Sequence, residues 1–159
     1  MKKLVALAAS TFLLTGCSAL IAPSYALPKN CDISQLQKVD SKYEIVDQTA
    51  EGSKDSRDCA IGVPNSDVGI FFGYSVRTDA QWTAVTEKLK AQGYKKWNSG
   101  VAGADTWRRQ EGALNSGVTC SISGHVSGLS FSVTEPWTAC EDVWNKQLVG
   151  YILTHARKN

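Results

Sequence analysis

The chain has 159 residues and a formal net charge of +2 at pH 7. Lys2 and Lys3 account for this excess, because the other 15 Lys and Arg side chains equal the 15 Asp and Glu side chains in number. Balanced charge without a dense basic stretch excludes the electrostatic surface that nucleic acids require, so we expect no nucleic-acid partner.

Residues 1–16 have the pattern of an export signal. Lys2 and Lys3 precede an uncharged apolar run over residues 4–14, which Thr15 and Gly16 follow. A basic region, a short apolar core and small residues are typical of a secretory signal peptide. The apolar run is shorter than the ~20 residues that cross a bilayer as a helix, so we expect cleavage rather than a membrane span.

The segment ends with Leu14-Thr15-Gly16-Cys17, a cysteine preceded by two small residues. It resembles the lipobox of bacterial lipoproteins. The resemblance implies lipid transfer to the Cys17 thiol and cleavage after Gly16. Anchorage becomes stable once two or three acyl chains are attached. We therefore expect the cell envelope: the outer face of the plasma membrane in a monoderm host, or the outer membrane in a diderm host, where Ser18 does not signal inner-membrane retention.

Ordinary secretion is the alternative, because Ser24-Tyr25-Ala26 resembles a small-x-small cleavage site. A cut there would leave a chain that begins at Leu27. The apolar run ends at the lipobox, which favours lipoprotein processing. We expect a signal peptide over 1–16, a lipidated N-terminus and tether over 17–30, and one globular domain over 31–159.

Four cysteines remain besides Cys17, an even number in an oxidising compartment where disulfides persist. Three connectivities are open. We favour Cys31–Cys59 and Cys120–Cys140, because these partners are near each other along the chain. Neither a CxxC pair nor a Cys/His pair with the spacing of metal ligands is present, so we expect no metal site.

Short elements open the domain. Residues 31–38 favour one or two helical turns, and 42–49 and 58–63 favour strands. The segment 64–67 is a turn cluster. The run 68–76 is rich in branched and aromatic residues and is the most strand-like of the chain, with glycines that indicate a bulge or close packing: Gly69 and Gly73.

The most distinct helix is predicted for residues 80–92. Thr78 and Asp79 offer an N-cap, and Gly93 stands where a C-terminal glycine belongs. Apolar side chains recur every three or four residues, which is the spacing of one helical face: Trp82, Val85 and Leu89.

The second half of the domain predicts two pairs of strands. Residues 94–97 and 104–110 form the first pair. Residues 117–123 and 129–133 alternate apolar with hydroxyl-bearing side chains and favour a hairpin joined through 124–128. Such strands have one apolar and one polar face, which indicates an antiparallel sheet with one side in contact with water.

Thr138 is expected to cap a final helix, with Glu141 completing a capping box three residues later. Its buried face is marked by five side chains: Trp144, Leu148, Tyr151, Ile152 and His155. The order of elements predicts an α+β fold, a curved antiparallel sheet packed by one or two helices and held by two disulfides.

No catalytic constellation is visible. We interpret His125 as a solvated residue of a glycine-flanked turn and His155 as a packing or capping residue of the last helix. The carboxylates are dispersed, and neither a nucleophile elbow nor a phosphate-binding loop is present. We expect no catalytic residues, no cofactor and no enzyme activity.

Five tryptophans are the main compositional hint of recognition. Trp107 stands between Asp105 and Arg108-Arg109 beside a glycine-rich loop, a mixture favoured at binding surfaces. Burial in the core is the favoured interpretation of Trp97 and Trp107, and the alternative is a binding surface formed by Trp97, Trp107, Arg108 and Arg109. The core accounts for the other three: Trp82, Trp137 and Trp144.

In general plan the mature domain is similar to small, uncharacterised cysteine-paired lipoproteins of actinobacteria, a likeness that transfers no site. We expect a non-catalytic binding or interaction module, held at a membrane by lipid on Cys17, with an envelope protein or glycan as its partner. The alternative is a lipid-anchored inhibitor of a lysozyme-like or protease-like enzyme, or a phage-exclusion factor. An enzyme is the third class.

Overall fold

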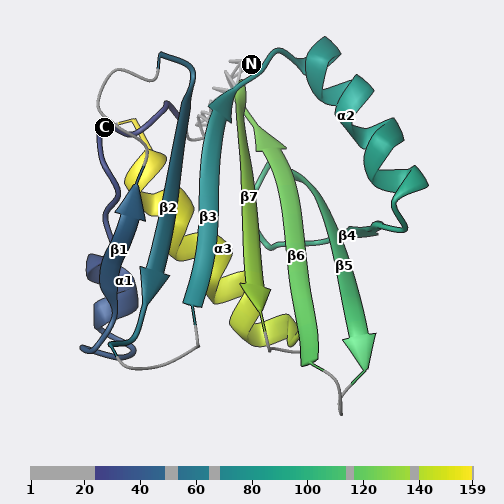
Figure 1. Ribbon diagram of the computed structural model, residues 1–159. Helices are drawn as coiled ribbons and strands as arrows, with labels where there is room; N and C mark the ends of the chain where they lie inside the picture. Colours follow the sequence, from purple (N-terminus) through teal and green to yellow (C-terminus); the bar gives the residue numbers. More distant parts are fainter. Residues whose placement is uncertain (1–23, 49–53, 65–68, 114–116, 137–139, 159) are drawn as a thin grey trace, which may run out of the picture.

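The computed structural model describes residues 24–48, 54–64, 69–113, 117–136 and 140–158. These residues form one seven-stranded antiparallel sheet and three helices (Figure 1). The strand order is β1-β2-β3-β7-β6-β5-β4. The strands are β1 (Glu44–Gln48), β2 (Ser56–Gly62), β3 (Gly69–Val76), β4 (Lys95–Trp97), β5 (Asp105–Ala113), β6 (Gly117–Val126) and β7 (Leu129–Pro136). The helices are α1 (Ser34–Gln37), α2 (Asp79–Ala91) and α3 (Asp142–Ala156). The predicted α+β fold is thereby confirmed.

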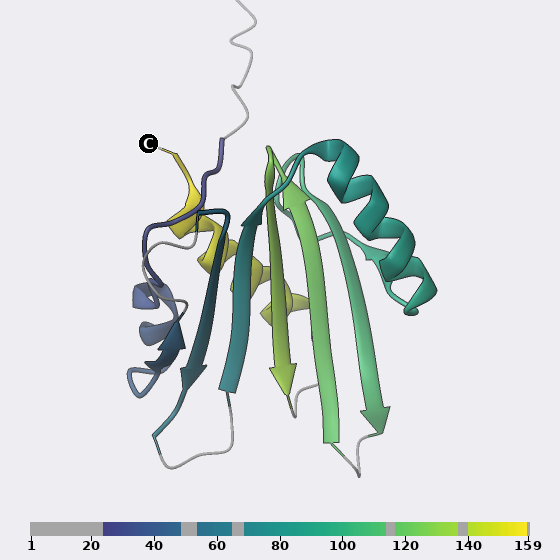
Figure 2. The same cartoon turned by 45° about the horizontal axis from the view of Figure 1, so that its top comes forward.

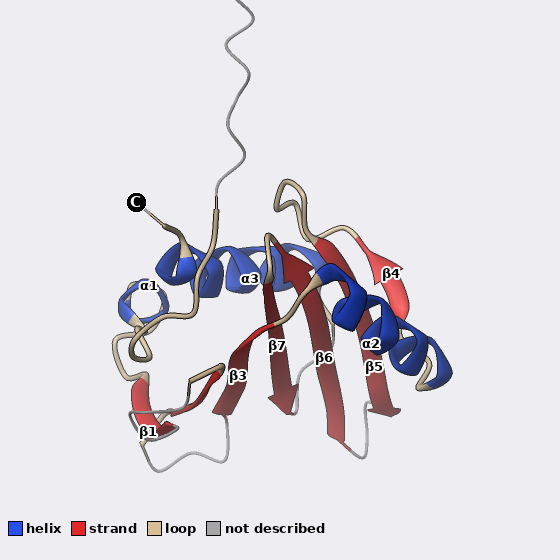
Figure 3. Cartoon of the chain, turned by 90° about the horizontal axis from the view of Figure 1, so that it is seen from above, coloured by secondary structure: helices blue, strands red, loops and turns tan. Residues whose placement is uncertain are grey.

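The helices cover the two faces of the sheet unequally. α3 runs behind the sheet in Figure 1, across the middle strands, whereas α2 lies on the other side beside β5 and β6. Figure 3, seen from above, shows α2 and α3 on opposite sides. One face is therefore covered through its centre and the other only towards one edge.

The sheet register sorts the side chains onto these faces, because successive residues of a strand point to opposite sides. Cys59, Phe72, Val133 and Ile122 are paired across β2, β3, β7 and β6. They face α3. The adjacent row consists of Asp58, Gly73, Ser132 and Ser123, and it lies on the face that α3 does not cover.

The main core lies between α3 and the sheet. The α3 side chains in it are Leu148, Val149, Ile152 and Leu153, all almost fully buried against the apolar row of the strands. Tyr74 donates its hydroxyl to the carbonyl of Ile152 at 2.7 Å. Burial raises the pKa of Tyr74, so this hydroxyl stays protonated and keeps its hydrogen bond.

Two disulfides join cysteines in the favoured connectivity. Cys31 is bonded to Cys59 of β2, and Cys120 of β6 to Cys140 before α3, with Cα–Cα separations of 6.1 and 5.1 Å. Both strand cysteines point to the α3 side, so each bond ties a covering segment to the sheet. The predicted pairing is confirmed.

The predicted helix over 80–92 is also confirmed, as α2. Thr78 accepts a hydrogen bond from the backbone N–H of Gln81, and the Gln81 side chain accepts one from the backbone N–H of Thr78. This reciprocal capping box satisfies two N–H groups that the helix leaves unpaired. Gly93 follows with a φ of +82°, a conformation that costs glycine little.

Two local predictions are wrong. The β6–β7 turn consists of Ser127 and Gly128, not of residues 124–128, because the ladder continues to the pair Val126–Leu129. The N-cap of α3 is Glu141, which makes no side-chain cap, so Glu141 is not the third residue of a capping box; Thr138, its expected partner, lies outside the described residues. Asp142 supplies the acidic charge that the helix dipole favours in the first turn.

The N-terminal segment joins the domain earlier than expected. Tyr25 is buried, its backbone pairs with Arg157, and the N–H of Ala26 donates to the carbonyl of Ala156. Figure 2 shows this purple segment beside the yellow end of α3. The domain therefore includes residues 24–30, which the sequence assigned to the tether. Cys17, the signal peptide, most of the turn cluster and Trp137 lie outside the described residues.

Within the described ranges, no helix combines the length and apolar character needed to cross a membrane.

Candidate functional site

The four residues predicted as a binding surface lie at the β4–β5 edge but divide between the two faces of the sheet. Trp97 and Arg108 point to the α3 side, whereas Trp107 and Arg109 point to the α2 side. The cause is the alternation of side chains along a strand, which sends the neighbours Trp107 and Arg108 in opposite directions. The structure thus brings the four residues together as two pairs and not on one face.

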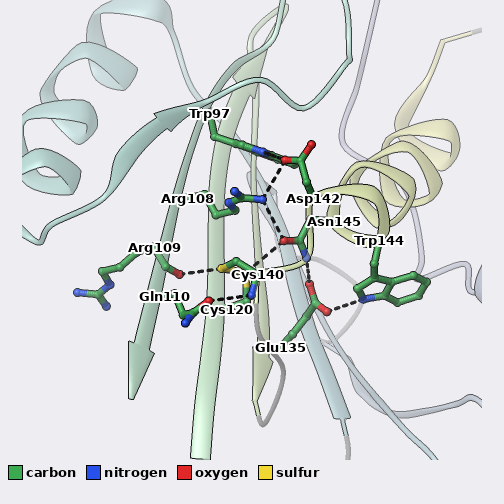
Figure 4. Close-up of a disulfide and its surroundings, with 10 residues drawn as sticks. All are labelled: Trp97, Arg108, Arg109, Gln110, Cys120, Glu135, Cys140, Asp142, Trp144 and Asn145. Carbon is green, nitrogen blue, oxygen red and sulfur yellow. Dashed lines mark hydrogen bonds and ion pairs between the residues drawn. A yellow bond between two sulfur atoms is a disulfide. The ribbon is translucent and has the colours of Figure 1, made fainter. Parts of the chain in front are cut away.

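On the α3 side, Trp97 and Arg108 hold the first turn of α3 against the sheet (Figure 4). The Arg108 guanidinium lies 4.8 Å from the centre of the Trp97 ring. Asp142 accepts hydrogen bonds from Trp97 Nε1 at 2.7 Å and from Arg108 Nη1 at 3.2 Å. Hydrogen bonds from Lys146 and then Trp97, with the Arg108 charge, lower the pKa of Asp142 to about 2.

The same network continues inward to Glu135, whose exposed fraction is 1%. Its carboxylate accepts from Trp144 Nε1 at 2.6 Å and from Asn145 Nδ2 at 2.7 Å. Asn145 Oδ1 accepts from Arg108 Nη1 at 3.4 Å, beside the Cys120–Cys140 disulfide (Figure 4). Buried polar groups persist where they are hydrogen-bonded. The polar network around Glu135 and Asn145 therefore holds α3 against the sheet, and it leaves little polar surface for a ligand.

On the α2 side, Trp107 is buried at 9% exposure and packs with Trp82 and Leu89. The ammonium groups of Lys90 and Lys96 lie 5.7 and 5.4 Å from the centre of its ring. The favoured interpretation of Trp107, burial in the core, is thereby confirmed. Trp107 therefore fixes α2 to β5 and offers no exposed aromatic ring.

A cavity of about 440 Å³ at this edge still gathers three of the predicted residues. Trp97, Arg108 and Arg109 line it together with Lys95 and Lys96. Three of these four cations pair with carboxylates of the described chain: Lys96 with Asp105, Arg108 with Asp142, and Arg109 with Glu111. Because a paired cation attracts a further anion weakly, this edge cavity is a poor anion site.

His125 is buried in β6, not solvated in a turn as the sequence suggested. The Asp79 carboxylate can only accept, so we assign the proton to Nε2, which donates to Asp79 Oδ1 at 2.9 Å. Nδ1 then accepts from Ser130 Oγ at 3.0 Å. The imidazole also stacks on Trp82, with ring centres 5.4 Å apart.

This chain contains the residue types of a serine hydrolase, but their exposure is reversed. In such enzymes the carboxylate is buried and the serine meets the substrate. Here the Asp79 side chain is 94% exposed, whereas Ser130 is 4% exposed. The arrangement ties the first turn of α2 to the β6–β7 hairpin, which is a structural role.

His155 lies in the last turns of α3 and binds the segment before α1. Its Nε2 is 2.9 Å from the carbonyl oxygen of Asn30, and its Nδ1 is 3.2 Å from Asp32. The backbone N–H of Ser34 is the main cause that lowers the pKa of Asp32, with a smaller contribution from His155. These contacts agree with a packing and capping residue. In the described part of the chain, no three His, Cys, Asp or Glu side chains gather as metal ligands.

The remaining surface of interest is the sheet face that α3 does not cover. Two cavities of about 380 and 290 Å³ lie on it and share three lining residues: Asp58, Gly73 and Ser132. The first extends to Asp47 and Gln48 of β1, and the second to Trp82 and Val85 of α2. We call this continuous depression the hydroxyl trough. It crosses β2, β3 and β7 between β1 and α2.

The floor of the hydroxyl trough is formed by short side chains. Its hydroxyls come from four strands: Ser56, Ser75, Ser123, Ser130, Ser132 and Thr134. At the centre, Gly73 has no side chain, and a Cβ there would lie 2.3 Å from Asp58 Oδ1. Because real Cβ atoms do not approach so closely, glycine at this position keeps the floor low under Asp58.

One wall of the hydroxyl trough is apolar. Phe71 projects from β3 with 52% of its surface exposed, beside Ala60 and Thr134 in the register. Isolated exposed apolar residues are common, but a large aromatic ring that lines a polar cavity offers a surface for a ligand. The hydroxyl trough therefore combines hydrogen-bonding groups with one aromatic platform.

The sequence contained only part of the signal for this site. The alternating serines of β6 and β7 predicted a polar face, and Gly73 predicted close packing. The site needs β3 beside β7, a pairing of distant segments that local patterns do not reveal. The prediction that one face contacts water is correct only in part, because Ser121 and Ser130 are buried.

None of the known protein families, curated proteins and solved structures compared with the chain matches it.

Proposed function

We propose that this chain is a lipid-anchored protein of the cell envelope whose domain is a non-catalytic binding module, with the hydroxyl trough as its binding surface. The observation that carries the proposal is the unequal covering of the sheet. The trough is a concave polar surface with an aromatic wall, of the kind that binds small ligands or chain segments.

The lipid anchor is supported by the lipobox ending at Cys17 and by the way the chain enters the domain. The rival cut after Ala26 would remove Tyr25, a buried residue that pairs with the end of α3. A cut before Cys17 leaves these contacts intact. The location that follows is the outer face of the plasma membrane in a monoderm host, or the outer membrane in a diderm host.

The anchor is tested with Cys17→Ser. We expect the unchanged protein in the membrane fraction, with a mass that includes acyl chains on Cys17, and the variant in the soluble fraction. A variant that stays in the membrane, or native protein that begins at Leu27 without lipid, would contradict this part of the proposal.

The binding surface is tested by sedimentation of the purified mature protein with isolated cell-envelope material. Ser132→Gln places a larger polar side chain on the trough floor, and Val143→Gln makes a comparable change at an exposed position on α3. We expect Ser132→Gln to reduce co-sedimentation and Val143→Gln to leave it unchanged. Equal binding by both variants would remove the hydroxyl trough as the surface.

A further inference from the structure

We infer that the hydroxyl trough binds a neutral glycan chain, an inference that depends on the binding module proposed above. The argument uses the charge of the lining, its hydrogen-bonding groups and the aromatic wall. Each of these features restricts the chemistry of the occupant.

The charge of the lining does not favour polyanions. Among the lining residues that the structure describes, two carboxylates and one guanidinium carry charge: Asp47, Asp58 and Arg77. Phosphate polymers, nucleic acids and anionic lipid headgroups would find one guanidinium and no cluster of cations among these described residues, so the lining offers them little electrostatic attraction. A ligand without charge needs no such attraction.

The hydrogen-bonding groups favour a ligand with many hydroxyls. Within the part of the chain that the structure describes, the hydroxyls of Ser123, Ser132 and Thr134 have no side-chain hydrogen-bond partner, and each can donate and accept. The backbone groups of β3 are engaged by β2 on one side and β7 on the other. A peptide lying on this floor therefore has no free strand edge to extend, which is the usual way that sheets bind peptides.

The aromatic wall adds a partly apolar contact. A sugar ring presents hydroxyls around its rim and C–H groups on its face, and an exposed aromatic ring offers a flat apolar surface to such a face. Phe71 provides this ring beside the hydroxyls of Ser132 and Thr134. From β1 to β6 the sheet spans about 19 Å, since neighbouring strands are ~4.8 Å apart, which accommodates a short oligosaccharide across the strands.

The test uses an array of neutral and acidic oligosaccharides, probed with the purified lipidated protein in detergent. We expect retention of neutral oligosaccharides and none of acidic ones. A neutral glycan retained on the array is then titrated by calorimetry. Phe71→Ala is expected to weaken its affinity roughly tenfold or more, as for an anchor residue at the centre of an interface.

Val76→Ala is the matched control, since Val76 lies on the same strand, has the same 52% exposure and is outside the trough lining. It is expected to leave the affinity unchanged. Retention of acidic glycans alone, an absence of retention, or equal loss in both variants would overturn the glycan inference. If envelope binding still depends on Ser132 in that case, the binding module stands with a different ligand. If it does not, the module fails as well.

Discussion

The two faces of the sheet are formed by the same strands with alternating side chains, yet only one face is covered by a helix through its centre. On the α3 side, both disulfides attach covering segments to strand residues, Cys59 and Cys120, and Glu135 fixes the start of the helix. On the other side, the contacts of α2 are with Trp107, Asp105 and His125 towards the β5–β6 edge. The comparison teaches that the apolar row of the strands makes one face the core, whereas the disulfides and Glu135 fix the segments that cover it.

The largest difference in the loss of unfolding free energy is expected between substitutions at two neighbouring residues of β7, Phe131 and Ser132. Phe131 faces α3, and its ring fills the space where a Cβ on Gly124 would stand, 2.2 Å from a ring atom. Phe131→Ala should cost roughly 3–5 kcal/mol of unfolding free energy, as for large-to-small core changes. Ser132→Ala, on the trough side, should stay within about 0.5 kcal/mol. Urea unfolding with the disulfides intact measures both, and similar losses would refute the difference between the faces.

The cross-links allow stability to be separated from binding. Replacing both Cys120 and Cys140 by Ala opens a connection with a sequence separation of 20, and the loss expected from chain entropy is about 3 kcal/mol. Because this bond attaches the α3 segment and lies outside the trough, the affinity of the folded variant for envelope material should not change. Reduced affinity in a variant shown by circular dichroism to be folded would mean that the two faces are coupled.

The buried carboxylate of Glu135 should contribute less to the free energy of unfolding than the Cys120–Cys140 disulfide. Glu135→Gln replaces an acceptor oxygen by an NH₂ group that must face Trp144 or Asn145, and leaving a buried donor unsatisfied costs about 1–3 kcal/mol. Glu44→Gln on the exposed strand β1 makes the same chemical change and should have an effect within about 0.5 kcal/mol. The free energies of unfolding of the two variants, measured at neutral pH, test this expected difference. Equal values would argue against a structural role for Glu135.

The smallest effect concerns acid stability on the α2 side. Burial alone would raise the pKa of Asp105, but hydrogen bonds from Lys96 and Trp82 outweigh it and lower that pKa. A lowered folded-state pKa contributes stability above the unfolded value of ~3.9, and this contribution is lost as pH falls through the folded value. Asp105→Asn should therefore flatten the decline in urea midpoint below about pH 4. A parallel decline in the unchanged protein and in Asp105→Asn would contradict the lowered pKa of Asp105.

Elements specified by neighbouring residues were predictable from the sequence. The helix α2 has its cap, its apolar spacing and its glycine stop within one short segment, and the β6–β7 hairpin shows a period of two. The disulfide pairing followed from proximity along the chain. For the helix and the hairpin the stabilising contacts are local, so the pattern of residues contains most of the information, whereas the disulfides join residues 28 and 20 positions apart.

The candidate site was predictable only in fragments because its parts are distant in sequence. Trp107 and Arg109 were predicted on a strand over 104–110 that pairs with 94–97, as β5 pairs with β4, but the face of each residue depends on the register and on how α2 packs. The start of α3 at Asp142 was missed because Arg108 and Trp97 bind this residue from another part of the chain. The trough required the β3–β7 pairing, which only tertiary packing specifies.

The pairing of Ser24 with Lys158 also limits how far the domain can work from a bilayer. With acyl chains on Cys17, the polypeptide from there to Ser24 reaches at most about 25 Å even when fully extended. The hydroxyl trough would thus bind its ligand within the layer immediately above the lipid headgroups. Glycans deeper in a thick cell wall would be out of reach of the domain, whereas glycan chains that lie against the membrane would contact it repeatedly.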